Sequence, residues 1–556
     1  MKSLTCAKIL ASALGVFLFL APSAGQTPTS PIDQYRLAIE HYNRNEHQLG
    51  AKALDTLTLD QIRQSLNTNS VYDCACIYAL AGDSEKALSL LRFLIFDRLY
   101  SDVNHLKTDP DLDALRGLVT WTELMLKAED NLRTLPARTM GYVKTELEKA
   151  KEILSKDQGA LWGDSIWNDK LLILSASNYV YSLRRFPGSR LDPTGIYWAS
   201  VPPGTFSSSN AVQSYQGREY AVVLVSYLAD RSATIIHELF HVLQFSQRKF
   251  NGLEVAYLDE PEARILLRAE YQALRNTLTA IERKEPIDQI VLALHDALYF
   301  RKQRQRIYAK SLATEIELET LEGVANYTGY KLASSENKIQ LALAELNKRE
   351  SAKSYTRNFP YATGLAYGMI FDALGIRWRR SAGDLYDFTK IVDEGLRGFA
   401  RHKVDVPAAK SRTNYDNIVD QETVRKKNYE ELQSALRQKF VVSPTLSVTL
   451  SAPNYTQTTD IDATAALKGV GTVFKFISGK NDLDAKNFGS FVSIRLEKPT
   501  SGVLRKDDGT TFVFGMPFRV EGNKIIGEDY EITLAPGWTV KQVNAKGDHA
   551  IVRVGQ

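Results

Sequence analysis

The spacing of apolar and polar residues divides the chain into a helical part, a mixed part and a β-rich part. Residues from about 30 to 125 have helical patterns throughout. Two runs further along, Gly195–Val201 and Glu219–Leu228, predict strands, and the second is rich in β-branched and aromatic residues. Four long helical stretches follow them, at Pro261–Arg283, Asp288–Ala313, Glu315–Ala333 and Gly364–Leu374.

From about residue 441 short runs alternate between apolar and polar residues, as in Leu446–Leu450, Phe491–Leu496 and Tyr530–Leu534. Asp507-Asp-Gly509 is typical of a hairpin turn between two strands. We therefore expect a multidomain protein with a mainly α N-terminal segment, an α+β middle domain and an all-β C-terminal domain. The last is predicted at 441–556, and its role as a lid, brace or attachment module stays open.

One helical hairpin stands out near the N-terminus, because two helices in residues 71–91 flank a turn at Gly82-Asp83. Five of its residues fall at the spacing of a tetratricopeptide repeat, namely Ala75, Tyr78, Gly82, Ala87 and Leu91. The segment 28–125 therefore resembles a tetratricopeptide-like unit and is a candidate site for a protein partner. A repeat array normally needs three units, so a helical layer packed on the rest of the chain is the alternative.

The N-terminus has the pattern of a targeting segment. Two lysines precede the apolar stretch Ile9–Ala21, and small residues follow it. We expect a cleaved secretory signal at 1–25 and an exported protein, in a bacterial periplasm or outside the cell. No later segment is apolar for long enough to cross a bilayer, so no stable membrane span is predicted. Cys74 and Cys76 lie two apart on a predicted helix, which disfavours a disulfide between them.

Composition limits the classes of partner. The chain has 556 residues, of which 44% are apolar and 24% charged, which is ordinary for globular protein of several domains. Its net charge of +4 is small for this length. Because no basic block is interleaved with aromatic residues, we expect no nucleic-acid partner.

Chemistry is indicated by His237-Glu238-Leu-Phe-His241, in an apolar run that predicts a buried helix. Two imidazoles four positions apart on a helix point the same way and can bind one metal ion. The glutamate after the first histidine can accept a proton from a metal-bound water. Asp230 or Ser232 can cap the start of this helix. The alternative is a core helix whose histidines are satisfied by neighbouring side chains.

Two glutamates compete to be the third ligand, because no histidine follows His241 closely. Glu322 shares an inward stripe with Leu318, Leu321 and Ala325, and Gly323 beside it permits close approach of another backbone. Glu270 lies in a similar stripe, where it could also pair with an arginine. Glu319 is expected on a solvated face with Glu315 and Asn326.

The motif His237–His241, followed by Glu322-Gly-Val-Ala-Asn-Tyr327, resembles the gluzincin metallopeptidases. The resemblance implies a zincin-like domain at 126–440, zinc bound by His237, His241 and Glu322, and Glu238 as general base. The 80 residues between His241 and Glu322 exceed the compact gluzincin spacing and imply an inserted helical segment. This departure keeps Glu270 open as the ligand.

The segment from Phe359 to Leu374 resembles the gluzincin element that carries an oxyanion-stabilising tyrosine. Tyr361, placed just before the helix predicted at Gly364–Leu374, is the first candidate and Tyr367 the second; simple packing is the alternative for either residue.

The leading functional hypothesis is an exported zinc metallopeptidase that hydrolyses peptide bonds in a peptide or protein substrate. In this hypothesis the strand Glu219–Leu228 pairs with the extended backbone of the substrate. Two alternatives stay open. One is a non-catalytic scaffold that binds a partner through its helical segment, and the other is a zinc hydrolase of a non-peptide amide in the cell wall.

Overall fold

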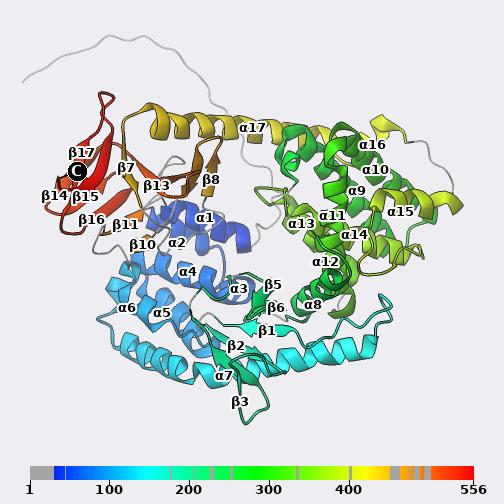
Figure 1. Ribbon diagram of the computed structural model, residues 1–556, viewed down its shortest axis with the longest axis horizontal. Coiled ribbons are helices and arrows are strands. Elements are labelled where there is room, and N and C mark those ends of the chain that lie inside the picture. The colour runs from blue at the N-terminus through cyan, green and yellow to red at the C-terminus, as the bar shows by residue number, and fades with distance from the viewer. Residues whose placement is uncertain are drawn as a thin grey trace, which may run out of the picture. The chain divides into compact units, whose positions relative to one another are not determined.

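A computed structural model describes most of the chain and divides it into two compact units, Met1–Arg133 and Thr134–Gln556 (Figure 1). The predicted signal at 1–25 lies outside the described residues. Those described are 31–43, 46–175, 178–202, 204–207, 209–225, 231–250, 255–333, 337–399, 404–450, 464–474, 478–480, 489–493 and 502–555.

The first unit is helical in its described part. Its helices and helical turns are α1 (Pro31–Asn43), α2 (His47–Leu54), α3 (Leu59–Ser65), α4 (Thr68–Leu80), α5 (Ser84–Arg92), η1 (Phe93–Asp97), α6 (Val103–Thr108) and η2 (Pro110–Leu115). The predicted hairpin is formed by α4 and α5, and Gly82 makes the turn with a φ of +81°, which favours glycine. Cys74 and Cys76 are buried and free. The resemblance to a tetratricopeptide unit stays a prediction.

The long helix α7 (Val119–Asp157) leads into the second unit, where a six-stranded sheet follows it. The sheet contains β1 (Leu171–Leu174), β2 (Tyr179–Ser182), β3 (Arg190–Leu191), β4 (Tyr197–Ser200), β5 (Ala211–Tyr215) and β6 (Arg218–Leu224). The strand order is β3-β4-β2-β1-β6-β5, with β1 and β6 parallel and the other neighbours antiparallel. The predicted strand Gly195–Val201 corresponds to β4.

The position of β6 limits one prediction. The strand expected at Glu219–Leu228 was to pair with a substrate backbone, but β5 pairs along Arg218–Val222 and β1 along Ala221–Leu224, so both edges are occupied at Ala221 and Val222. A strand that is paired on both sides has no free ladder for a peptide. Residues 226–230 of the expected strand lie outside the described part.

Alternate residues of this sheet face two different apolar clusters. Leu171, Ile173 and Val223 pack into the large core formed with the helices, whereas Leu172 and Val222 belong to a smaller cluster on the other face. This alternation follows from the two-residue period of a strand. Residues of the helix that follows β6 belong to the same large core, so this helix packs on the first face of the sheet.

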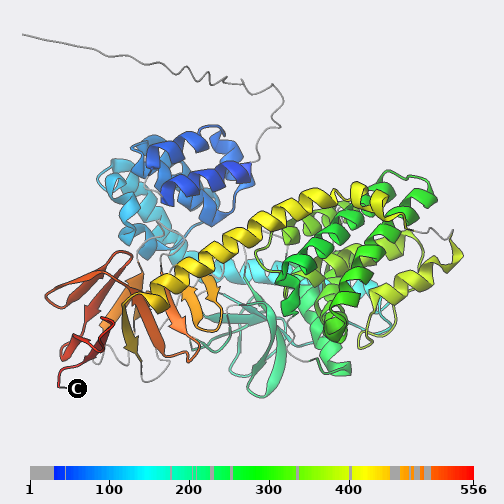
Figure 2. The same ribbon diagram turned by 90° about the horizontal axis from the view of Figure 1, so that it is seen from above.

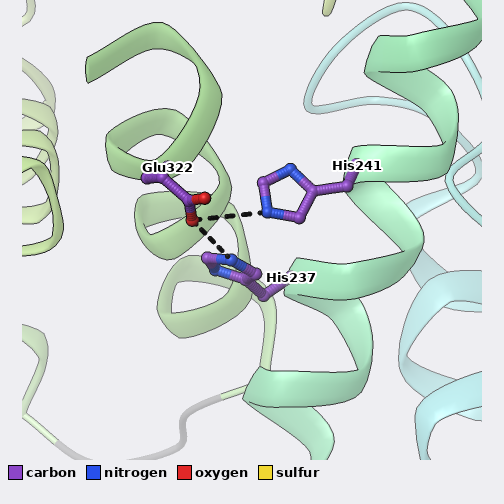
Figure 3. A group of neighbouring side chains, drawn as sticks. All are labelled: His237, His241 and Glu322. Carbon is purple, nitrogen blue, oxygen red and sulfur yellow. Dashed lines mark ion pairs between the residues drawn. The ribbon is translucent and has the colours of Figure 1, made fainter. Parts of the chain in front are cut away.

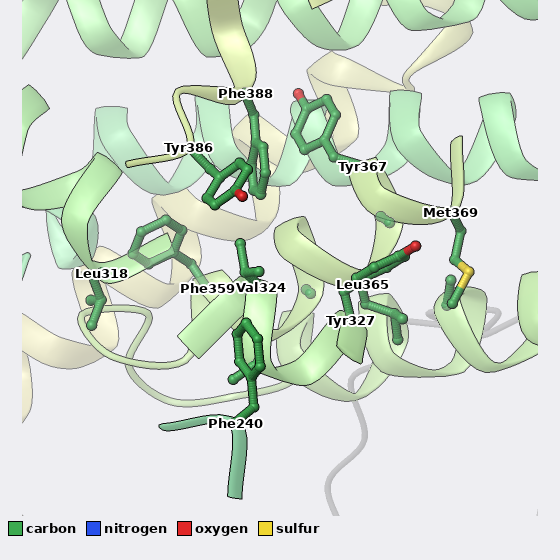
Figure 4. Packing of buried hydrophobic residues seen from close by; sticks show 14 of the residues in the cluster. Phe240, Leu318, Val324, Tyr327, Phe359, Leu365, Tyr367, Met369, Tyr386 and Phe388 are labelled. Carbon is green, nitrogen blue, oxygen red and sulfur yellow. The ribbon is translucent and has the colours of Figure 1, made fainter. Parts of the chain in front are cut away.

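The helical layer contains α8 (Ser232–Gln247), η3 (Ala256–Asp259), α9 (Pro261–Glu282), α10 (Ile287–Ile307), η4 (Ala309–Ser311), α11 (Leu312–Leu318), η5 (Glu319–Gly323), α12 (Val324–Ala333), α13 (Lys338–Glu350), α14 (Phe359–Ala373), α15 (Phe388–Gly395), η6 (Leu396–Gly398) and α16 (Val406–Arg412). Figure 4 shows how side chains from several of these helices interlock in the shared core. Trp162 stacks on Phe240 of α8 at 5.2 Å between ring centroids and donates a hydrogen bond to Thr328 of α12. The core thereby joins α8 to α12.

The C-terminal part is β-rich, as expected. A seven-stranded sheet has the order β17-β18-β7-β13-β12-β9-β8, and a five-stranded sheet has the order β10-β11-β16-β15-β14. The strands are β7 (Thr445–Thr449), β8 (Thr464–Leu467), β9 (Gly471–Phe474), β10 (Ser478–Lys480), β11 (Gly489–Ser493), β12 (Val503–Lys506), β13 (Thr511–Gly515), β14 (Phe518–Glu521), β15 (Lys524–Gly527), β16 (Tyr530–Leu534), β17 (Trp538–Gln542) and β18 (His549–Arg553). The predicted hairpin turn at Asp507–Gly509 joins β12 to β13. Residues of both sheets share one apolar cluster, so the sheets pack face to face.

The long helix α17 (Tyr415–Arg437) connects the helical layer to the β-rich part, and Figure 2 shows it in yellow between them. Ile418 near its start packs with Leu266 of α9, and Leu436 near its end packs with the seven-stranded sheet, where the turn η7 (Gln438–Val442) follows. This order of helical, mixed and β-rich parts agrees with the predicted fold class, whereas the zincin-like identity stays a prediction. None of the helices in the described part is both long and apolar enough to cross a membrane.

Candidate metal centre

The helix α8 presents the two histidines of the motif on one side. His237 and His241 are 8% and 6% exposed, and their rings meet edge to face at 4.6 Å between centroids. The helix begins at Ser232, so Ser232 is its first residue rather than its cap, and Asp230 lies outside the described residues. Four residues are slightly more than one helical turn, which is why both rings reach the same space.

The third member of the group comes from η5, a single π-helical turn between α11 and α12. Glu322 of this turn lies opposite both histidines (Figure 3). Its Oε2 lies 3.4 Å from Nε2 of His237 and 3.5 Å from Nε2 of His241. One-turn π-helices inside α-helices occur frequently at functional sites.

Glycines allow these helices to approach closely enough to form the group. A Cβ on Gly329 of α12 would lie 2.4 Å from the carbonyl oxygen of Ala233 on α8. A Cβ on Gly364 of α14 would lie 2.3 Å from the Cα of Gly323, next to Glu322. The close approach expected at Gly323 is therefore present, and it brings the start of α14 to the same place.

The geometry of the three side chains fits a shared metal ion. Two ligands that each lie about 2.1 Å from a tetrahedral ion are about 3.4 Å apart, which matches both measured distances. Oε2 of Glu322 is buried and has no hydrogen-bond partner in the described part of the chain, although burying an unsatisfied carboxylate oxygen is unfavourable. Two imidazoles and one carboxylate form a donor set that suits zinc.

A glutamine that the sequence did not indicate orients His241. Nδ1 of His241 lies 2.9 Å from Oε1 of Gln244, and Nε2 of Gln244 donates to the carbonyl of Thr320 at 2.8 Å. Because the Gln244 amide oxygen can only accept, Nδ1 carries a hydrogen, and Nε2 is left as the ring nitrogen that can bind a metal ion. Gln244 lies three residues after His241 on α8, a spacing that could have identified it. Although burial opposes protonation, the Glu322 carboxylate raises the pKa of His241 to about 9 in the metal-free group.

Glu238 has the environment of a proton acceptor. It is 5% exposed, and its Oε2 is buried without a hydrogen-bond partner among the described residues. Burial raises the pKa of its carboxyl group. Glu238 and His237 line a pocket of about 430 Å³, so the carboxylate adjoins both the candidate metal centre and space for a ligand.

Tyr361 also lies at the group, in the first turn of α14 rather than before the helix as expected. Its ring stacks almost parallel to that of His237, with 5.8 Å between centroids. Burial and the nearby Glu322 carboxylate raise the pKa of Tyr361, so that its hydroxyl keeps the hydrogen and can donate it. Asn326 of α12 donates to the Tyr361 carbonyl at 2.7 Å, and the Arg349 guanidinium lies 4.3 Å from the ring centroid. These two supports had no evident signal in the sequence.

The rival ligand Glu270 lies elsewhere, in a buried set that we call the arginine network. Its members are Glu270, Glu315, Glu319, Arg301 and Arg304, all with fully buried side chains. Glu270 contacts Arg301 at 3.1 Å and Arg304 at 2.7 Å, as in the alternative that pairs it with an arginine. Tyr367, the second tyrosine candidate, donates to Glu270 at 3.0 Å and so belongs to this network.

The expectation of a solvated face at Glu319 was wrong. Glu315 and Glu319 are fully buried because Arg301 and Arg304 of α10 pack against that face and pair with them. Asn326, assigned to the same face, is 8% exposed. Helical periodicity shows which residues share a face, but it does not show whether that face meets water or a charged neighbour.

A second group that could hold a metal lies in the first unit, at Cys76, Asp109 and Asp111. Its carboxylates already accept hydrogen bonds from Tyr72 and Tyr42. This leaves the His237, His241 and Glu322 group as the better candidate in the described part of the chain. Comparisons with protein-family models, curated proteins and solved structures gave no match to this chain.

Proposed function

We propose that the protein is an exported zinc-dependent peptidase with its active site at His237, His241 and Glu322. One observation carries the proposal: Oε2 of Glu322 lies at tetrahedral ligand spacing from two buried imidazoles, beside Glu238, whose buried Oε2 has no hydrogen-bond partner among the described residues. If the His237, His241 and Glu322 group were only a structural ion pair, the buried Oε2 of Glu238 beside it, which has no hydrogen-bond partner among the described residues, would have no explanation. The targeting pattern at 1–25 supports the exported location.

The side chains have distinct roles in this proposal. His237, His241 and Glu322 hold the zinc, which when bound polarises the scissile carbonyl and lowers the pKa of a water molecule. Glu238 accepts a proton from the attacking water and delivers it to the amide nitrogen as the carbon–nitrogen bond breaks. The Tyr361 hydroxyl donates a hydrogen bond to the oxygen on which negative charge develops. Gln244 keeps the His241 ring in the orientation that binding requires.

The first experiment separates a catalytic from a structural role of Glu238. In Glu238→Gln the side chain keeps its size but cannot accept the proton, so we expect retained zinc and peptide cleavage reduced at least about 100-fold. Zinc content is measured by elemental analysis, and cleavage is followed with a mixture of short peptides by mass spectrometry. Glu262→Gln, an exposed substitution in the first turn of α9, is the matched control.

Unchanged cleavage in Glu238→Gln would contradict the proposal. If the wild type binds one zinc and cleaves no peptide but does cleave a cell-wall amide, the amide-hydrolase alternative is favoured. Absence of both zinc binding and hydrolysis would favour the scaffold alternative.

A further inference from the structure

The pocket beside Glu238 is rich in cationic side chains. It is bounded by α8, α12, α13 and the start of α14, and its volume is about 430 Å³. Its positive residues are Arg231, Lys348, Arg349 and Arg357. Only Glu238 and Glu345 oppose them in its lining, and both are buried. We call this space the cationic pocket.

The positive charges differ in how they are compensated. Arg349 donates to Glu345 at 2.7 Å and to Asn358 at 2.9 Å, so its charge is balanced and its position fixed over Tyr361. Lys348 and Arg357 are exposed, and neither forms an ion pair with another described residue. The pocket therefore has a surplus of positive charge close to the reacting groups.

Arg231, at the start of α8, adds to this surplus. Its side chain donates to the carbonyl of Leu224 at 3.2 Å, while its Nε is buried and has no partner in the described part of the chain. A carbonyl group does not neutralise a guanidinium. Like charges gathered in a walled space repel one another and attract an anion.

The size and chemistry of the cationic pocket indicate the anion. A volume near the lower end of the usual range of about 300–1,000 Å³ suits a short segment of a ligand. Guanidinium and ammonium groups form strong, charge-assisted hydrogen bonds with carboxylates. Peptides have such groups at the C-terminus and in the side chains of aspartate and glutamate.

We propose that the cationic pocket binds a carboxylate of the substrate close to the scissile bond, with Arg357 and Lys348 as its binding residues. This inference rests on the proposed peptidase function and specifies the substrate class. If the pocket binds the free C-terminal carboxylate, the enzyme is a carboxypeptidase that cleaves close to the C-terminus. A side-chain carboxylate would make it selective for acidic positions within a chain.

The test uses one cleaved peptide in matched forms. The zinc-loaded wild type is compared on the free acid, the C-terminal amide, and versions in which glutamate next to the scissile bond is replaced by glutamine. We expect kcat/KM to fall about tenfold or more when the recognised carboxylate is removed. A loss only with the amide identifies the C-terminus, and a loss only with glutamine identifies the side chain. Equal values for all forms would overturn the inference.

Substitutions of pocket residues test whether the cationic pocket causes the preference for charged peptides. In Lys348→Gln and Arg357→Gln the difference between the charged and uncharged peptides should shrink, and in the double variant it should disappear, mainly through KM. Arg357→Lys should keep part of it. Arg377→Gln, which removes an exposed cation from a different cavity, should keep all of it. A preference that persists in the double variant would contradict the assignment.

A binding measurement separates this inference from the proposed function. In Glu238→Gln the peptides are not turned over, so their dissociation constants can be measured by fluorescence anisotropy. We expect tighter binding of the charged peptide, weakening with added salt. If the charged peptide binds more tightly but the wild type cleaves no peptide, the carboxylate inference stands and the proposed peptidase function is contradicted. If the wild type cleaves the peptides but neither binds nor cleaves the charged form preferentially, the peptidase function stands and the carboxylate inference is contradicted.

Discussion

Two buried polar clusters contain carboxylates from the same run of helix, and they differ in how those carboxylates are satisfied. In the arginine network, both oxygens of Glu270, Glu315 and Glu319 accept hydrogen bonds. At the candidate metal centre, Oε2 of Glu322 and Oε2 of Glu238 accept no hydrogen bond from the described part of the chain, although the Glu322 oxygen lies near both histidines. Glu319 and Glu322 belong to the same π-helical turn, although the Glu319 side chain is fully buried and that of Glu322 is 21% exposed.

The comparison suggests a rule for this protein. A buried cluster whose carboxylate oxygens all accept hydrogen bonds holds helices together, as the arginine network does for α9, α10, α11 and α14, although Nε of Arg304 has no hydrogen-bond partner among the described residues. A buried cluster with unsatisfied oxygens is complete only with a ligand. If this rule holds, the two clusters respond in opposite ways to substitution and to metal.

The largest effect is expected from Arg301→Ala. It leaves Glu319 buried without its cation and Glu270 with Arg304 alone, which should lower the free energy of unfolding by about 3–5 kcal/mol. Urea unfolding can be followed through the fluorescence of the buried Trp162 and Trp378. Arg306→Ala, an exposed position on the same helix, should change stability by less than about 0.5 kcal/mol. Equal losses of stability in both variants would show that the arginine network does not stabilise the fold.

Glu322→Gln, at the metal centre, should affect zinc binding more than it affects the stability of the metal-free protein. Without metal, the loss of stability should be smaller than in Arg301→Ala, because the histidines can become neutral once the Glu322 carboxylate is removed. Zinc at 100 times its dissociation constant should stabilise the wild type by about 2.7 kcal/mol, and this gain should vanish in the variant. If zinc stabilises the variant as much as the wild type, Glu322 does not bind the metal and has only a structural role.

A smaller effect, shared by both clusters, is expected from Gly364→Ala. The new methyl group would meet the backbone of Gly323, so α14 must move away from η5. We expect a loss of about 1–3 kcal/mol in stability, together with weaker zinc binding. Gly141→Ala, where a methyl group meets nothing within 4 Å, is the control. If zinc binding is unchanged while stability falls, the helix contact does not position the centre.

The smallest effect is expected from Gln244→Ala. It removes the hydrogen bond that orients His241, and zinc affinity should fall about 10- to 100-fold with the fold intact. Competition with a fluorescent chelator measures this affinity. Ser246→Ala, on the same helix and exposed, should leave it unchanged. An unaffected affinity in Gln244→Ala would show that the ring needs no such support.

Much of the helical layer could be predicted because local signals mark it. Helix α9 begins at Pro261 as expected, since proline fits the first helical turn. The strand β1 was missed because its four residues are apolar without alternation, which is typical of a strand buried on both faces. The histidine pair could be recognised from residue types and spacing, whereas Glu322 was favoured over Glu270 by a family resemblance. The roles of Glu319 and Arg349 could not, because their partners come from other parts of the chain.

The central claim is tested most directly by titrating metal-free protein with zinc and recording the X-ray absorption spectrum of the complex. The account predicts one equivalent of zinc with two imidazole ligands and one carboxylate, lost in His237→Ala. A sulfur ligand would place the metal at Cys76, and stoichiometric binding that survives His237→Ala would also contradict the account.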